Sequence, residues 1–430
     1  MSDAPFELDL SLQVGKYDIR KLLGKGATGT VYLAVDTFTG KEVALKVIEP
    51  EVFRDPQFGT VHRTQFLNEA SLAGKLRHPH IVAILDAVVQ EDSGHIAMEC
   101  VTGGDLSQHA TPQTLLPVAD VLQMMFKCCG ALDYAFHEGV VHRDIKPANI
   151  MIAHGTDVKI ADFGAALLRK AQAVQTASIG SPYYMSPEQM DGKPLTHHSD
   201  MYCLGVVLYE LLTGRKPLEA DTLQALVFKV MNNDPVPPSS VRPELPREID
   251  RVVLRALGKK PDDRYGTWSE FANELSKLVR LVLPPEAISD SEKYVALKRV
   301  EMLSGLSDAD IWELANAGRW TRVGSRRTVI KENDPGASFF FLAQGQVRVT
   351  RKGRLLNMID GGEFFGEMAY IRGGALPRHA TVESSNDILL AEFEPAALEK
   401  MSIGAQYYLT RALVRNLVDR LELANTRLAR

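Results

Sequence analysis

Charged and amide side chains in the first part of the chain are spaced in a way that favours phosphoryl transfer. Lys46 lies within an apolar run, Asp144 and Asn149 share one polar block, and Asp162 precedes Phe163-Gly164. A lysine ammonium can hold phosphate oxygens, and carboxylate and amide oxygens can hold a divalent cation beside them. Together these residues favour transfer of a phosphoryl group from a nucleotide, a reaction that depends on positioning and charge.

A glycine-rich loop precedes these residues. Gly24, Gly26 and Gly29 are followed by Val31, between two runs that read as strands. Backbone N–H groups can approach phosphates closely only where side chains are absent. A plain hairpin turn would use the same glycines, but the strand-like flanks and the later charged motifs favour a phosphate-binding loop.

Two kinds of local pattern must position these residues. Short runs of β-branched and apolar residues predict strands at 17–23, 31–36, 43–48, 81–89 and 96–101. Apolar residues at helical spacing predict helices at 66–76, 118–137, 202–212, 223–231, 248–257 and 269–278. A strand-rich lobe followed by a helical lobe is an α+β arrangement with two lobes.

The ordered set of motifs resembles the eukaryotic-type (Hanks-type) serine/threonine protein kinases over residues 17–283. The motifs are the glycine loop, Lys46, the block from His142-Arg143-Asp144 to Asn149, Asp162-Phe163-Gly164 and Ser186-Pro187-Glu188. The resemblance implies a two-lobed kinase fold with ATP and Mg²⁺ in the cleft. It also implies an active enzyme, a non-specific serine/threonine protein kinase.

The resemblance assigns roles to the charged residues. Lys46 would hold the α- and β-phosphates and pair with Glu69, while Lys146 would contact the γ-phosphate as in serine/threonine kinases. Asp144 would accept or orient the proton of the substrate hydroxyl. Asn149 and Asp162 would hold Mg²⁺.

Further positions follow from the same resemblance. Met98 would lie at the back of the adenine pocket, and Asp105 would contact the ribose or cap the surface. The implied ATP contacts are Gly24, Gly26, Gly29, Val31, Ala44, Lys46, Glu69, Glu99, Val101 and Asp105. Three residues have structural roles in the family, namely Glu188 paired with Arg264, and Asp200.

Two hydroxyl residues in the segment after Asp162 are candidate phosphorylation sites. Thr176 and Ser178 lie between Asp162 and Glu188, and Arg143 would belong to a basic pocket for such a phosphate. An equal alternative is that both are solvated loop hydroxyls.

A second region follows a proline-rich break. Pro284-Pro285 opens an expected linker at 284–296, and residues 297–430 form an expected second domain. Residues 327–393 alternate in polarity and carry many glycines, which predicts a small β-barrel or jelly roll, and a long helix is expected at 405–428.

This second region resembles a cyclic-nucleotide-binding domain of the catabolite-activator type. The resemblance rests on Phe365-Gly366-Glu367 and on Pro377-Arg378-His379-Ala380. It implies that Glu367 accepts the ribose 2′-hydroxyl, that Arg378 pairs with the cyclic phosphate, and that backbone groups from Gly366 onward add donors. His379 departs from the usual alanine or threonine, so the base preference, cAMP or cGMP, stays open. Another anion, or no ligand, is the alternative.

The last helix carries an apolar stripe that includes Leu409, Leu413, Leu417 and Leu421. Such a stripe can pack on its own domain, cap a ligand or pair with a second chain as a homodimer.

Composition excludes several classes of protein. The chain has 430 residues, 45% hydrophobic and 24% charged, and a net charge of −5, so the overall charge gives no reason to expect nucleic-acid binding. No apolar run has the length of a membrane span, and residues 1–16 read as a tail rather than a signal peptide. The four cysteines form no C-x-x-C pair and suit a reducing, cytoplasmic location.

The sequence therefore predicts an ATP-dependent serine/threonine kinase that acts on protein substrates and is regulated by a cyclic nucleotide. Two alternatives remain open: a cyclic-nucleotide-responsive scaffold with weak kinase activity, and a constitutive kinase with a barrel that binds nothing.

Overall fold

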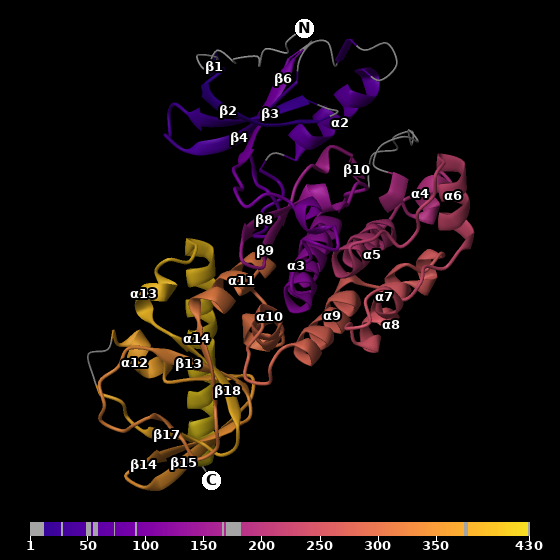
Figure 1. The fold of residues 1–430 in the computed structure, drawn as a ribbon. Helices are drawn as coiled ribbons and strands as arrows, with labels where there is room; N and C mark the ends of the chain where they lie inside the picture. The colour runs from indigo at the N-terminus through magenta and orange to yellow at the C-terminus, as the bar shows by residue number, and fades with distance from the viewer. Residues whose placement is uncertain are drawn as a thin grey trace. The chain divides into compact units, whose positions relative to one another are not determined.

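The computed structural model describes residues 13–26, 29–48, 53–54, 59–72, 74–90, 93–165, 167–168, 182–373 and 377–428. The chain divides into two compact units, Met1–Val282 and Leu283–Arg430 (Figure 1). The α+β prediction is confirmed: the first unit has a strand-rich lobe and a helical lobe, and the second is rich in strands.

The strand-rich lobe of the first unit is built on one antiparallel sheet. Its strands, in the order in which they pair, are β1 (Gln13–Val14), β2 (Tyr17–Gly26), β3 (Gly29–Asp36), β4 (Glu42–Ile48), β6 (Gly94–Glu99) and β5 (Ile84–Val89). One face buries Tyr17, Val43 and Leu45. The other buries Ile48 and Phe66, the latter from helix α2 (Gly59–Ser71). Because successive side chains of a strand point to opposite faces, β4 contributes buried apolar residues to both faces of the sheet.

The bounds of α2 differ from the helix expected at 66–76. It begins at Gly59 and ends at Ser71. Gly74 has φ +70°, a left-handed conformation that glycine adopts without strain and that stops an α-helix. The predicted C-terminal end at residue 76 is therefore wrong.

The second lobe of this unit is helical. Its helices are α3 (Val118–His137), α4 (Pro187–Met190), α5 (His197–Thr213), α6 (Leu223–Asn232), α7 (Pro238–Val241), α8 (Arg247–Ala256) and α9 (Trp268–Val282). Helix α3 has the bounds expected from its apolar spacing, and α5 starts before the predicted residue 202 because Thr196 and Ser199 form a capping box. Four short strands complete the lobe: β7 (Val140–Val141), β8 (Ile150–His154), β9 (Asp157–Ile160) and β10 (Leu167–Leu168).

The second unit contains two four-stranded antiparallel sheets. One has the order β11 (Arg319–Val323), β18 (Ile388–Phe393), β13 (Phe339–Gln344) and β16 (Glu363–Phe365). The other has the order β12 (Thr328–Ile330), β17 (Thr381–Ser384), β14 (Gln346–Arg351) and β15 (Arg354–Asp360). Alternate residues of β13 enter two cores: Phe340 and Leu342 join one, and Phe339 and Phe341 join the other.

Helices complete the second unit. They are α10 (Asp290–Lys298), α11 (Asp308–Ala317), α12 (Glu367–Ile371), α13 (Pro395–Leu398) and α14 (Ile403–Leu428). The expected linker at 284–296 overlaps α10, whose first turn is capped by the Ser289 hydroxyl, 3.1 Å from the N–H of Glu292. Leu297 of α10 belongs to the core of this unit. The whole of the expected linker thus falls within the second unit.

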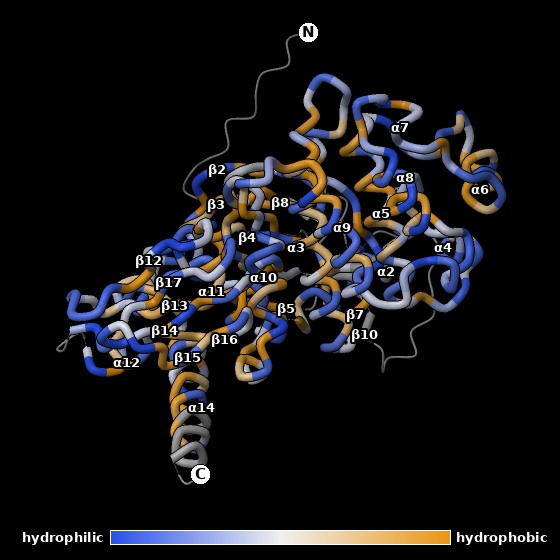
Figure 2. The backbone as a smooth tube through the Cα atoms, turned by 90° about the horizontal axis from the view of Figure 1, so that it is seen from below, coloured by the Kyte–Doolittle hydropathy of each residue, from blue (hydrophilic) through white to orange (hydrophobic). Residues whose placement is uncertain are grey.

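Helix α14 changes its surroundings along its length. Leu409 and Leu413 are buried in the core of the second unit, whereas Leu421 is 62% exposed. In Figure 2 the helix carries apolar and polar stretches alternately. Within the described ranges, no helix combines the length and the apolar character needed to cross a bilayer.

Candidate functional site

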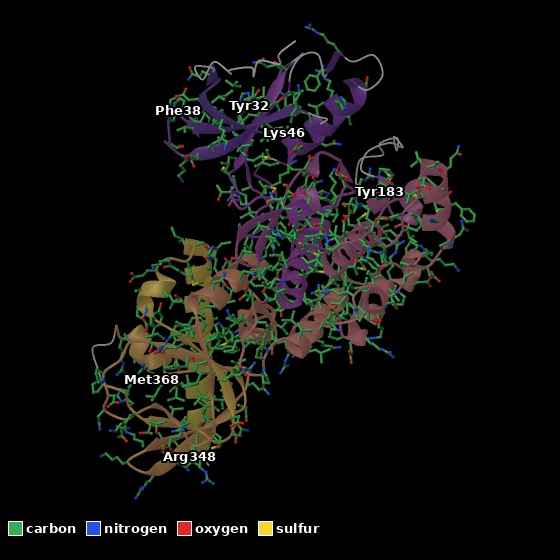
Figure 3. The ribbon with its side chains drawn as sticks, viewed as in Figure 1. Tyr32, Phe38, Lys46, Tyr183, Arg348 and Met368 are labelled. Carbon is green, nitrogen blue, oxygen red and sulfur yellow. The ribbon has the colours of Figure 1, made fainter. Side chains whose placement is uncertain are left out.

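The ammonium of Lys46 lies between two carboxylates. Lys46 projects from β4 (Figure 3), and its Nζ is 2.7 Å from Glu69 Oε2 on α2 and 3.2 Å from Asp162 Oδ1. Lys46 and Glu69 are both buried. Burial alone would lower the pKa of Lys46, but the two carboxylates raise it above its ordinary value. The ammonium therefore stays charged.

Asp162 is held ionised by the same contact. Burial would raise the pKa of Asp162, but the charge of Lys46 and the hydrogen bond from its Nζ hold it below its ordinary value. Its backbone has φ +61°, an uncommon conformation for a residue with a side chain. An ionised carboxylate in this position suits binding of a cation.

Two side chains of the block from His142 to Asn149 also converge on one carboxylate. Lys146 Nζ donates to Asp144 Oδ2 over 2.7 Å, and Asn149 Nδ2 donates to the same oxygen over 3.1 Å. Asn149 Nδ2 also lies 2.7 Å from the backbone oxygen of Asp144. These donors fix the orientation of the Asp144 carboxylate.

A buried aspartate, Asp200, accepts hydrogen bonds from the backbone of this loop. Asp200, in the first turn of α5, accepts hydrogen bonds from the backbone N–H groups of His142 and Arg143, each over 2.7 Å. Arg143 has φ +72°, so the loop is held in a strained conformation at this point. Asp200 thus holds the backbone of the loop that carries Asp144.

The loop that carries Asp144 and the segment that carries Asp162 are in contact. His142 Nε2 lies 3.0 Å from the backbone oxygen of Ala161, and the rings of His142 and Phe163 are 4.5 Å apart between centroids. These contacts join the loop that carries Asp144 to the segment that carries Asp162. Asn149 and Asp162 offer amide and carboxylate oxygens, which are the hard ligands that Mg²⁺ prefers, so the donor set fits this ion.

In the glycine-rich loop, packing within the lobe requires one of the glycines, Gly29. Gly24 pairs with Val31 and Gly26 with Gly29 across the β2–β3 hairpin. A Cβ on Gly29 would lie 2.5 Å from the backbone oxygen of Val47, whereas a Cβ on Gly24 would meet nothing within 4 Å. Close packing against β4 therefore requires glycine at position 29, whereas no contact within the lobe requires it at position 24.

The expected adenine-contacting segment lies at the end of β6. Ala44 pairs with Met98 between β4 and β6. The N–H of Glu99 donates to the oxygen of Ala83 over 2.9 Å, and the Glu99 carboxylate is 3.0 Å from Lys159 Nζ. The backbone N–H of Glu99 is therefore engaged within the lobe. Lys159, which sequence reasoning missed, anchors this segment to β9. Val101, two residues after Glu99, is half-buried.

Asp105 caps a short helix. Its Oδ1 accepts the backbone N–H of Ser107 over 2.8 Å at the start of the 3-10 helix Leu106–His109. This contact matches the surface-cap alternative for Asp105. The two candidate phosphorylation sites, Thr176 and Ser178, lie outside the described residues.

A buried ion pair joins distant parts of the helical lobe. Arg264 donates from Nη1 and Nη2 to the two carboxylate oxygens of Glu188, over 2.7 and 2.8 Å. It also donates to the backbone oxygens of Gly258 and His198, over 2.9 and 2.7 Å. The pair holds α4, which follows the segment containing the candidate phosphorylation sites.

The second unit brings its predicted ligand residues into one small region. Gly366 caps α12 with φ +78°, and Glu367, the first residue of α12, is buried. Arg378 is also buried, and its Nη1 donates to the oxygen of Gly366 over 3.2 Å. His379 is exposed and lies 3.4 Å from Arg372 Nη1. Figure 3 marks Met368, whose side chain is exposed on the same helix.

Comparison with known proteins identifies two domains. A model described as "Protein kinase domain" matches residues 17–277, and one described as "Cyclic nucleotide-binding domain" matches residues 321–402. A probable serine/threonine-protein kinase PknB of Corynebacterium glutamicum is 37% identical over 277 residues, 62% of this chain and 42% of that protein. The serine/threonine-protein kinase PknB of Mycobacterium leprae is 35% identical over 327 residues, 72% of this chain and 52% of that protein. The chain spans about half the length of the curated relatives it matches.

Proposed function

Because the chain belongs to the protein kinase family, we propose that it transfers the γ-phosphoryl group of ATP to serine or threonine hydroxyls of protein substrates, under the control of a cyclic nucleotide or similar small anion bound by its second unit. The observation that carries the catalytic part is the position of Lys46 between Glu69 and Asp162, at 2.7 and 3.2 Å. A lysine paired in this way is the arrangement that a kinase needs in its active form.

The proposed reaction uses the charged groups in turn. Lys46 holds phosphate oxygens of ATP, and the Asp144 carboxylate accepts the proton of the attacking hydroxyl. Lys146, 2.7 Å from Asp144 Oδ2, can stabilise charge on the transferred group. Asn149 and Asp162 would hold Mg²⁺, which when bound neutralises charge on the phosphates.

The ligand part rests on Arg378 and Glu367. A buried guanidinium suits a cyclic phosphate, and a buried carboxylate at the start of α12 suits a ribose hydroxyl. The exposed His379 lies at the position that the sequence connects with base choice, so cAMP and cGMP are both candidates. Control of the kinase requires that the ligand bind one of two kinase arrangements more tightly than the other.

Phosphate transfer from labelled ATP tests both parts. The purified protein is assayed for transfer onto itself and onto a generic protein substrate, with and without cAMP and cGMP. We expect one nucleotide to change the rate, and Arg378→Ala to remove that change while basal transfer persists, because Arg378 lies in the second unit. We expect Lys46→Met to abolish phosphate transfer, which would show that the activity belongs to this site.

Other outcomes assign another function. Transfer that neither nucleotide changes would favour the constitutive kinase. No transfer with Mg²⁺ or Mn²⁺ would favour the scaffold.

We also propose that α14 pairs with the same helix of a second copy. Tyr407, Val414 and Leu421 recur every seven residues on α14 and are 60, 48 and 62% exposed. A seven-residue apolar repeat is typical of helices that pair.

Light scattering after size exclusion tests this pairing. We expect about twice the 47.5 kDa chain mass for the wild type and a monomer for Val414→Glu/Leu421→Glu. Leu355→Glu, which changes an equally exposed leucine on β15, should stay dimeric. A monomeric wild type would contradict the pairing.

A cytoplasmic location is consistent with the cysteines. All four are free, and burial raises the pKa of the Cys128 thiol to about 12, so this thiol stays protonated. Unpaired buried thiols suit a reducing compartment.

A further inference from the structure

Three neighbours fix the guanidinium of Arg378. Its Nη1 donates to the oxygen of Gly366, and its Nη2 donates to Ser338 Oγ over 3.1 Å. Its Cζ lies 5.9 Å from the centre of the Phe340 ring. A Cβ on Gly336 would lie 2.9 Å from Nη2, so only glycine leaves room for the guanidinium at that side. The side chain is therefore held before any ligand arrives.

The Ser338 hydroxyl connects Arg378 to a carboxylate. Ser338 is buried, and its Oγ lies 2.8 Å from Glu392 Oε1 on β18. Arginine can only donate and an ionised carboxylate can only accept, so the hydroxyl accepts from Arg378 and donates to Glu392. The other oxygen of Glu392 accepts from Arg319 on β11. A polar chain thus runs from Arg378 to β11.

We infer that Ser338 is a positioning residue for anion binding, holding Arg378 through a hydrogen bond that Glu392 orients; this inference rests on the proposed ligand site. A carboxylate in direct contact would occupy the two-pronged guanidinium and compete with an incoming phosphate. A serine placed between Arg378 and Glu392 orients the guanidinium through its hydroxyl. The Glu392 carboxylate then stays near Arg378 without contacting the guanidinium directly. The sequence alone gave no signal for Ser338, which lies 40 residues from Arg378.

Titration of the full chain with cAMP and with cGMP tests this role. Ser338→Ala should weaken binding of either nucleotide that binds by about ten- to a hundredfold, the loss of one hydrogen bond to a charged group. Ser338→Thr keeps the hydroxyl and should stay within about threefold of the wild type. The ratio of the two affinities should not change, because Ser338 acts on the phosphate contact and not on the base.

Ser384→Ala is the matched control. Ser384 is equally buried in the same unit, and its hydroxyl bonds to the oxygen of Gly324 over 2.7 Å without contact to Arg378. This variant should bind as the wild type does, although it loses a buried hydrogen bond. Wild-type affinity in Ser338→Ala, equal weakening in Ser338→Thr or equal weakening in Ser384→Ala would each overturn the inference.

If neither nucleotide binds the wild type, the proposed ligand fails but Ser338 can still be tested. The Nε–Hε NMR signal of Arg378, assigned by its loss in Arg378→Lys, reports how firmly the guanidinium is held. Ser338→Ala should broaden or shift this signal, and Ser338→Thr should preserve it. An unchanged signal in Ser338→Ala would overturn the positioning role.

Discussion

Asp144→Asn is expected to lower the turnover number for phosphate transfer by about 10²- to 10⁴-fold while ATP still binds. Asparagine has nearly the shape of aspartate but cannot accept the proton of the attacking hydroxyl. It also removes the charge that Lys146 Nζ contacts over 2.7 Å. Single-turnover transfer to a protein substrate, together with binding of a fluorescent ATP analogue, separates the chemical step from nucleotide binding.

The control for this variant is a surface aspartate of the same lobe. Asp191 forms an exposed ion pair with Lys193, 2.7 Å apart, directly after α4. Asp191→Asn should leave turnover within about twofold, because exposed pairs contribute little. Wild-type turnover in Asp144→Asn would assign proton acceptance to another group.

Arg264→Leu is expected to destabilise the first unit by about 3–5 kcal/mol. Arg264 is fully buried and makes a two-pronged ion pair with Glu188, at 2.7 and 2.8 Å. Removal of the guanidinium leaves the buried Glu188 carboxylate without its cation. Two backbone oxygens, those of Gly258 and His198, also lose a donor. Denaturant unfolding should show the loss as a lower midpoint.

The unfolding of this unit can be followed separately. The chain has three tryptophans, and Trp268 lies in the first unit, whereas Trp312 and Trp320 lie in the second. A Trp312→Phe/Trp320→Phe background leaves Trp268 as the fluorescent reporter. In this background Arg251→Leu, which breaks an exposed pair with Glu274, should cost less than about 1 kcal/mol.

A double variant separates a lost interaction from an uncompensated charge. Arg264→Leu/Glu188→Leu removes both members of the buried pair and should recover part of the stability, because no unpaired charge remains inside. If Arg264→Leu costs no more than Arg251→Leu, the buried pair does not hold the lobe together.

Much of the first unit could be predicted because its signals are local. The apolar spacing of 118–137 is long enough to fix both ends of α3. The strand at Lys46 was predicted from alternation. The helix ends that the sequence-based prediction placed wrongly also have local causes. Gly74 at φ +70° stops α2, and the Ser289 hydroxyl caps α10 inside the expected linker.

Other features depend on contacts that a sequence does not show. Glycine at position 29 is required by the backbone oxygen of Val47, on another strand. Lys159 of β9 reaches Glu99 at the end of β6, and Ser338, just before β13, reaches Arg378, which precedes β17. Such long-range pairs depend on the register of the folded sheets, which no single segment encodes.

The first unit precedes the second along the chain, so the ribosome completes it earlier in each newly made molecule. The catalytic unit ends at Val282, and the ribosome must then add the 148 residues from Leu283 to Arg430 before the second unit is whole. At about 5–20 residues per second this takes roughly 7–30 s, and domains generally fold as they emerge. Until the second unit has been made and has folded, a nascent chain carries the first unit without it, so any restraint that the second unit exerts begins only then.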